Sequence, residues 1–171
     1  MRWLDAMMLY RAACKARALG LPFFPALLRR AIYLLHHAVL PPEAKIGEGT
    51  VLGYGGLGVV IHGDARIGRH CFISHEVTIG GRSGLKGAPR IGDYVRIGAG
   101  AKILGNVRVE DFAVVGANAV VTRDVSRGAV VAGVPARELR RDPEPMRSYL
   151  REHTANQVRG GDLFPTGEQP S

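Results

Sequence analysis

The chain has 171 residues, with 23 Lys and Arg against 15 Asp and Glu, which gives a formal net charge of +8. This length suits one domain with a sizeable core. Aromatic residues make up only 6% of the sequence, and they are not interleaved with basic residues as on a nucleic-acid-binding surface. We therefore expect no nucleic-acid partner.

The cysteine content and the N-terminus indicate a cytoplasmic protein. Two cysteines, Cys14 and Cys71, are too few for a disulfide framework. Asp5 interrupts the apolar start of the chain, which does not fit a signal peptide. Residues 21–40 are mostly apolar, but Arg29 and Arg30 lie in their middle, so we expect no membrane-spanning helix.

Two helices are predicted first in the chain, at residues 3–19 and 25–38, with a Gly-Leu-Pro break between them. Two interpretations of this segment remain open. In the first, the helices are a cap that shields the start of the next domain. In the second, residues 23–38 contact a membrane peripherally, at its inner face, because Arg29 and Arg30 stand beside two phenylalanines and several leucines.

A repeat with a period of six follows. Aliphatic residues recur in one frame at Ile61, Ile67, Ile73, Ile79, Ile91, Ile97, Ile103, Val109, Val115 and Val121. A small or β-branched residue stands four positions after most of them, and glycines at several turns should supply conformations closed to other residues. This period fits neither an amphipathic helix nor an alternating strand. It predicts a solenoid in which three short strands form each triangular coil of roughly 18 residues.

Two stretches interrupt the repeat and a short segment ends the chain. Residues 54–58 predict a bulge, and residues 80–90 predict a loop that projects from the coil. Long loops on a regular scaffold often carry functional residues. A short helix is expected at 144–152, and the polar end from about 156 is expected to be disordered. The expected division is an N-terminal helical segment at 1–40, the solenoid domain at 41–136 and a C-terminal segment at 137–171.

Three segments resemble the hexapeptide-repeat acetyltransferases, at residues 77–81 (Val-Thr-Ile-Gly-Gly), 97–105 (Ile-Gly-Ala-Gly-Ala-Lys-Ile-Leu-Gly) and 132–137 (Ala-Gly-Val-Pro-Ala-Arg). They are most similar to the serine acetyltransferase branch and its relatives from capsule and exopolysaccharide clusters. The resemblance implies an all-β, left-handed parallel β-helix with an N-terminal helical cap and a short C-terminal helix. It also implies acetyl-CoA as acyl donor, a hydroxyl as acceptor and no metal.

The chain departs from serine acetyltransferases at their catalytic positions. Gly53-Tyr54 stands where those enzymes carry an Asp-His pair, Ala88-Pro89-Arg90 where they carry a loop histidine, and Val39 where they carry an orienting aspartate. The capsule-type relatives share a histidine just before the Val-Thr-Ile-Gly strand, and His75 occupies that position. The resemblance therefore favours a hydroxyl of a sugar or polysaccharide precursor as acceptor, with serine O-acetylation as the alternative.

His75 is the candidate general base, because acetyl transfer needs a group that takes the proton of the attacking hydroxyl and histidine suits this near neutral pH. It is the third residue of its hexad and is expected to face outward. His62 is the candidate supporting or acceptor-binding residue. Glu76 or Asp93 could orient an imidazole, and Cys71 is expected in the core.

The acyl-CoA groove is expected along an edge of the prism. Ala99 and Ala117 are 18 residues apart, so they should stack on successive coils and leave room for the pantetheine arm. By resemblance to sugar acetyltransferases of this fold, the matching positions are Ala99, Ala117, Thr122, Arg123, Arg137 and Arg140. Lys102 is a further candidate, and arginine suits the phosphates of CoA.

A zinc enzyme like the γ-carbonic anhydrases, which share this solenoid, is the remaining catalytic alternative. His70 and His75 are five residues apart, and His62 would be the third ligand, across a trimer interface. The flat faces of so short a prism predict a homotrimer whose active site has walls from two chains. A dimer of trimers is also compatible with the sequence.

Overall fold

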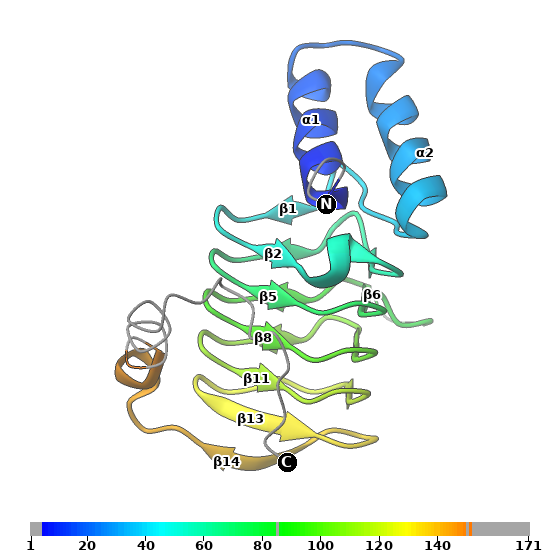
Figure 1. Cartoon of the computed structure of the whole chain (residues 1–171). Helices are drawn as coiled ribbons and strands as arrows, with labels where there is room; N and C mark the ends of the chain where they lie inside the picture. The colour runs from blue at the N-terminus through cyan, green and yellow to red at the C-terminus, as the bar shows by residue number, and fades with distance from the viewer. Residues whose placement is uncertain (1–4, 85, 150, 152–171) are drawn as a thin grey trace, which may run out of the picture.

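The computed structural model describes residues 5–84, 86–149 and 151. It is an all-β, left-handed parallel β-helix with a helical hairpin on its first coil (Figure 1). The hairpin consists of α1 (Ala6–Ala18) and α2 (Phe24–His36). The fold class expected from the hexad repeat is confirmed.

The first helix is the cap. Its N-terminus is closed by Asp5, whose side chain accepts a hydrogen bond from the Met7 amide at 2.9 Å. It buries one face against the first coil, where the Tyr10 hydroxyl donates to the Ala44 carbonyl at 2.7 Å. The second helix packs on the first, and Ile32 is its one buried residue. The prediction of a helical cap is therefore confirmed, with α1 providing the contact.

Three sheets form the faces of the prism, and all their strands are parallel except the last strand of the second sheet. The first sheet contains β1 (Lys45–Ile46), β4 (Arg66–Ile67), β7 (Arg90–Ile91) and β10 (Arg108–Val109). The second contains β2 (Val51–Leu52), β5 (Phe72–Ile73), β8 (Arg96–Ile97), β11 (Val114–Val115), β13 (Ala129–Ala132) and β14 (Arg137–Arg141). The third contains β3 (Val60–Ile61), β6 (Thr78–Gly80), β9 (Lys102–Leu104) and β12 (Val120–Val121).

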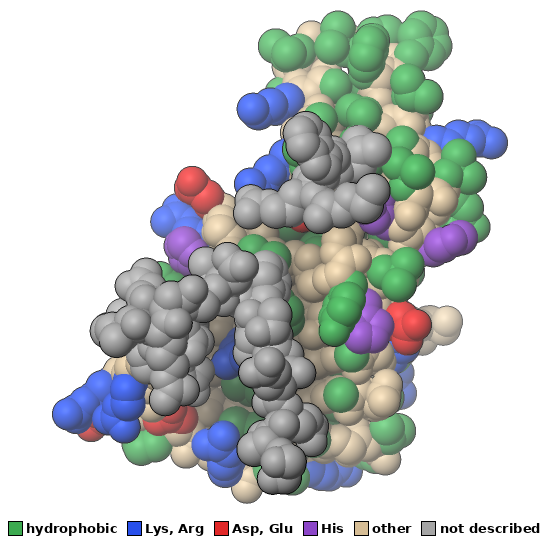
Figure 2. All heavy atoms as spheres, in the orientation of Figure 1, with side chains coloured by type: hydrophobic (Ala, Val, Ile, Leu, Met, Phe, Trp, Pro, Cys, Tyr) green, Lys and Arg blue, Asp and Glu red, His purple; other side chains and the backbone are tan. Residues whose placement is uncertain are grey.

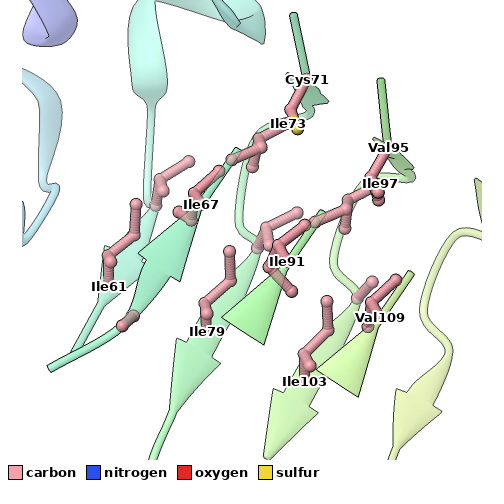
Figure 3. Packing of buried hydrophobic residues seen from close by; sticks show 14 of the residues in the cluster. Ile61, Ile67, Cys71, Ile73, Ile79, Ile91, Val95, Ile97, Ile103 and Val109 are labelled. Atoms are coloured by element: carbon pink, nitrogen blue, oxygen red, sulfur yellow. The ribbon is translucent and has the colours of Figure 1, made fainter. Parts of the chain in front are cut away.

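The inward residues of the hexads make the core. In the second sheet Ile97 pairs with Ile73 above it and Val115 below it, and all three are buried. The other sheets show the same stacking, for example Ile79 on Ile103 (Figure 3). Because every coil presents the same kind of side chain at the same place, the core is a set of aliphatic columns.

Glycines serve close approach between coils at some positions and positive-φ turns at others. A Cβ on Gly68 would lie 2.5 Å from the carbonyl carbon of Gly92 in the next coil, so only glycine fits. Non-glycine residues hold the left-handed conformation at one edge, with φ of 53° at His70 and 59° at both Tyr94 and Phe112. The expectation that glycines supply the turns was wrong at this edge, where these three rings stack one above another.

The interruptions and the C-terminus add local structure. Instead of a bulge, residues 53–56 form an irregular turn, η1 (Gly53–Gly56), in which Tyr54 and Gly55 have positive φ. The stretch between β6 and β7 leaves the coil as predicted, although Leu85 lies outside the described residues. The chain then adds β14, an unpredicted strand antiparallel to β13. Residues 145–149 are helical, and the expected disorder from 156 lies outside the described residues.

Candidate active-site edge

His75 lies on the edge where the second sheet turns into the third, between β5 and β6. Its side chain is half-buried, so it does not simply project into solvent as expected. Within the part of the chain that the structure describes, the buried Nδ1 has no hydrogen-bond partner. A buried polar atom without a partner is uncommon in folded proteins, and it distinguishes His75 from an ordinary surface histidine.

Tyr54 is the aromatic neighbour of His75, a contact that the sequence did not predict. The two ring centroids are 4.9 Å apart and the rings meet edge to face at 80°. Tyr54 has a φ of 52°, which turns its side chain away from the core and leaves it 80% exposed. The glycines around Tyr54 were the available signal, because they mark a tight turn beside this edge.

Neither proposed carboxylate orients His75. Asp93 lies on another edge, where its Oδ1 accepts from the Arg69 amide at 2.7 Å. The side chain of Glu76 packs against Gly58, and its backbone carbonyl accepts from Lys102 Nζ at 2.6 Å. The expectation that Glu76 or Asp93 holds the imidazole is therefore not met in the described residues.

His62 lies on a different edge, where the third sheet turns into the first. Its Nδ1 accepts from the Asp64 amide at 3.1 Å, so in the neutral ring the proton is on Nε2. That Nε2 would lie 3.9 Å from a Cβ on Gly81, at the start of the extruded loop. A single chain thus places His62 and His75 at opposite edges of the third sheet.

The small residues proposed to line the acyl-CoA groove share an edge with His75. The Gly100 amide donates to the His75 carbonyl at 3.0 Å, and the Asn118 amide donates to the Ala99 carbonyl at 2.8 Å. Ala99 and Ala117 therefore follow His75 on successive coils, as their spacing predicts. Ala99 is half-buried and Ala117 is exposed. Lys102, in the neighbouring strand β9, reaches this edge through its bond to Glu76.

The remaining cofactor candidates are divided between two places. Thr122 and Arg123 follow β12 and lie on the edge of His62. Arg137 and Arg140 lie in β14 and are exposed. The Ala136 amide donates to the Val120 carbonyl at 2.8 Å, which places the start of β14 beside the last strand of the third sheet. The prism edge that carries His75 therefore reaches, at its last coil, the start of β14 at Arg137.

The structure separates the three histidines of the zinc alternative. His70 lies on the third edge, where its ring stacks on Tyr94 at 5.1 Å. His62, His70 and His75 therefore occupy three different edges, and the proposed pairing of His70 with His75 in one chain was wrong. Among the described residues, no cluster of three His, Cys, Asp or Glu side chains is arranged to hold a metal ion.

Comparison with known proteins gives the same class as the fold. Residues 88–123 match the bacterial transferase hexapeptide family (six repeats). A serine acetyltransferase of Synechocystis sp. is 39% identical over 136 residues, which cover 78% of this chain and 54% of the relative. The chain therefore spans little more than half the length of this relative.

Solved structures of serine acetyltransferases have the same solenoid. The Brucella abortus enzyme in complex with coenzyme A superimposes with a TM-score of 0.76 at 33% identity, covering 81% of this chain and 57% of that one. The soybean enzyme complexed with serine gives a TM-score of 0.72 at 36% identity, covering 78% and 56%.

The chain has the hexapeptide-repeat, left-handed β-helix fold. This follows from its aliphatic columns, its three sheets and these matches. Within that class it is similar to the serine acetyltransferases, both in sequence and in structure.

Proposed function

We propose that this protein is an acetyl-CoA-dependent O-acetyltransferase. The observation that carries the proposal is the edge between the second and third sheets, where His75 is followed on successive coils by the small residues Ala99 and Ala117. Small side chains on the coils that follow the base would leave room for a pantetheine arm along this edge, as acetyl transfer needs. The similarity to a serine acetyltransferase that binds coenzyme A supports the same donor.

The transfer needs one base and one set of hydrogen-bond donors. As the acceptor oxygen attacks the thioester carbonyl, Nε2 of His75 takes the hydroxyl proton. Backbone amides at the coil turns stabilise the negative charge that develops on the carbonyl oxygen. When the tetrahedral intermediate collapses, the C–S bond breaks and the imidazolium returns the proton to the CoA sulfur. Cys71 takes no part, because it is buried and its Sγ contacts the Gly92 carbonyl.

The named relatives support L-serine as the acceptor better than the sugar hydroxyl that the sequence favoured. One observation keeps a sugar as the second candidate. Tyr54 presents an exposed aromatic ring beside His75, and such a ring can pack on the apolar face of a pyranose. Arg82 or Arg90 would have to bind the carboxylate of free serine.

The active site is proposed to form between chains of a homotrimer. His75 lies on one edge of the third sheet, and His62 with Arg123 lies on the other. A three-fold axis beside these edges would bring the His75 edge of one chain to the His62 edge of the next. The His62 Nε2 proton is then available as a donor to the acceptor substrate.

The test is the release of CoA thiol from acetyl-CoA in the presence of L-serine or of a panel of sugars. His75→Asn should lower kcat by about 10²–10⁴-fold, the usual contribution of a general base. His37→Asn is the matched control: His37 is exposed, has a φ of 50° that asparagine tolerates, and lies outside the edge. If His75→Asn keeps more than about a third of kcat with the better acceptor, another group is the base.

The same assay separates the two acceptors. Tyr54→Ala should raise KM for a sugar that packs on the ring and leave KM for serine nearly unchanged. If the wild-type protein releases no thiol with either acceptor class, the proposed activity is refuted.

A further inference from the structure

The outer end of the helical hairpin exposes an apolar tip, which we define as Leu19, Leu21, Phe23, Phe24 and Leu27. Phe23 is 82% exposed, Leu19 75% and Leu27 64%. Figure 2 shows hydrophobic side chains gathered over this end of the molecule, with Lys and Arg side chains on both sides just below it. Contiguous apolar surface of this kind on a protein marks an interaction site.

Packing within the chain does not explain the tip. The cap function belongs to α1, which buries its residues against the first coil, and α2 buries only Ile32. The two helices lead the chain away from the solenoid and back again, so the tip lies at the end opposite β14 (Figure 1). The tip side chains contribute little to the hydrophobic core and remain available to a partner.

The charges around the tip are mostly basic, and Glu43 is the acidic residue that lines the hollow beneath it. From residue 6 to residue 42 the sequence contains five Lys and Arg and no acidic residue. Lys15 and Arg17 lie in the last turn of α1, and Arg29 and Arg30 lie about two turns into α2. Arg17 and Arg29 also line a hollow of about 410 Å³ under the tip, where Arg17 pairs with Glu43 at 3.6 Å.

We propose that the apolar tip inserts into the interface of an anionic lipid bilayer, with the basic residues below it in the headgroup layer. Apolar side chains gain free energy by leaving water for the acyl boundary. Lys and Arg at the level of the headgroups are attracted to anionic lipids, while their aliphatic stems remain beside the apolar side chains. In the described residues no helix is long and apolar enough to cross the bilayer, so the contact is peripheral.

The charge pattern favours a lipid surface over a second copy of the chain. Two tips placed end to end would bring Arg29 and Arg30 of each chain toward those of the other, which costs free energy. An anionic surface reverses the sign of that interaction. In the proposed trimer the three hairpins would point the same way along parallel solenoid axes, so three weak contacts would act on one surface.

The experiment measures co-sedimentation of the full chain with vesicles of equimolar phosphatidylcholine and phosphatidylglycerol. We expect binding to these vesicles at low salt, release at high salt and no binding to phosphatidylcholine alone. The double variant Phe23→Ser/Phe24→Ser should lower the partition coefficient at least about tenfold. Its matched control is Leu139→Ser, which removes a 68%-exposed apolar side chain from β14 at the far end of the solenoid.

The charges are tested separately. Arg29→Glu/Arg30→Glu should abolish the preference for phosphatidylglycerol, whereas Arg108→Glu, on the first sheet, should not. Circular dichroism establishes that each variant is folded. The proposal is overturned if the wild-type chain does not sediment with anionic vesicles at low salt, or if the phenylalanine variant binds as well as the wild type. Light scattering identifies a second copy of the chain as the occupant. If the wild type does not bind vesicles and the phenylalanine variant has half the mass of the wild-type assembly, a second copy covers the tip and the proposal is overturned.

Discussion

Gly98→Ala is expected to destabilise the solenoid at the candidate active-site edge. A Cβ on Gly98 would lie 2.5 Å from the Ala117 nitrogen and 2.9 Å from the Ala117 Cα. These atoms belong to the backbone of the next coil, which is held by the bond from the Gly116 amide to the Val131 carbonyl at 2.8 Å. The coil spacing must therefore open. Overpacking of this kind costs about 1–3 kcal/mol, and the rigid partner places the expected loss near the upper value.

Gly63→Ala is the matched control, because the same methyl group meets different surroundings. A Cβ on Gly63 would have the Glu43 Cβ as its nearest neighbour at 3.6 Å, an ordinary contact. The substitution should stabilise by about 0.4–1 kcal/mol, since it restricts the unfolded chain.

Thermal unfolding at fixed protein concentration measures the contrast between the two alanines. A chain of this size changes its Tm by about 2–4 °C per kcal/mol, so Gly98→Ala should lower Tm by about 6–12 °C and Gly63→Ala should raise it slightly. Equal Tm values for the two variants would refute the reasoning that close approach of coils requires glycine at residue 98.

Two further predictions concern the donor site and the thiols. Arg123→Ala and Arg137→Ala should each weaken CoA binding by roughly 10–100-fold in calorimetry, because a charge-assisted hydrogen bond to a phosphate is lost. Arg66→Ala on the first sheet is the control. Unchanged CoA affinity in both variants would contradict the assignment. Burial raises the pKa of the Cys71 thiol to about 11, so at pH 8 a thiol reagent should modify the half-buried Cys14 in the native protein and reach Cys71 only after unfolding. Rapid native labelling that persists in Cys14→Ala would contradict the buried position of Cys71.

The hexad repeat predicted the solenoid because its signal is local and repeated. Each aliphatic position, such as Ile73 or Ile97, faces the same interior on every coil, so the period in the sequence is the period of the structure. The strand β14 carried no such signal. Its residues are all exposed, and they pair with β13 in the antiparallel sense through a turn at residues 133–136.

The candidate site was predicted only in part, because it depends on which edge of the prism a residue occupies. Ile61, Ile67 and Ile73 begin three successive hexads, so the histidines that follow them fall on three successive edges. The repeat therefore contained the signal that separates His70 from His75. The contact of Tyr54 with His75 could not be predicted in this way, because it depends on the positive φ of Tyr54 in an irregular turn.

The opposite positions of His62 and His75 allow a test of whether the site is shared between neighbouring chains. If it is shared, a site needs an intact His75 from one chain and an intact His62 from the next. His62→Asn and His75→Asn proteins, each of low activity alone, are unfolded together in equal amounts and refolded as mixed assemblies. In random mixing, about a quarter of the interfaces then pair the two intact residues, and kcat per site should recover to about a quarter of the wild-type value. Light scattering should give three chain masses for the mixture. Activity that stays at the level of the separate variants in such an assembly would show that His62 and His75 do not act across one interface, and a mass of one chain would refute the trimer itself.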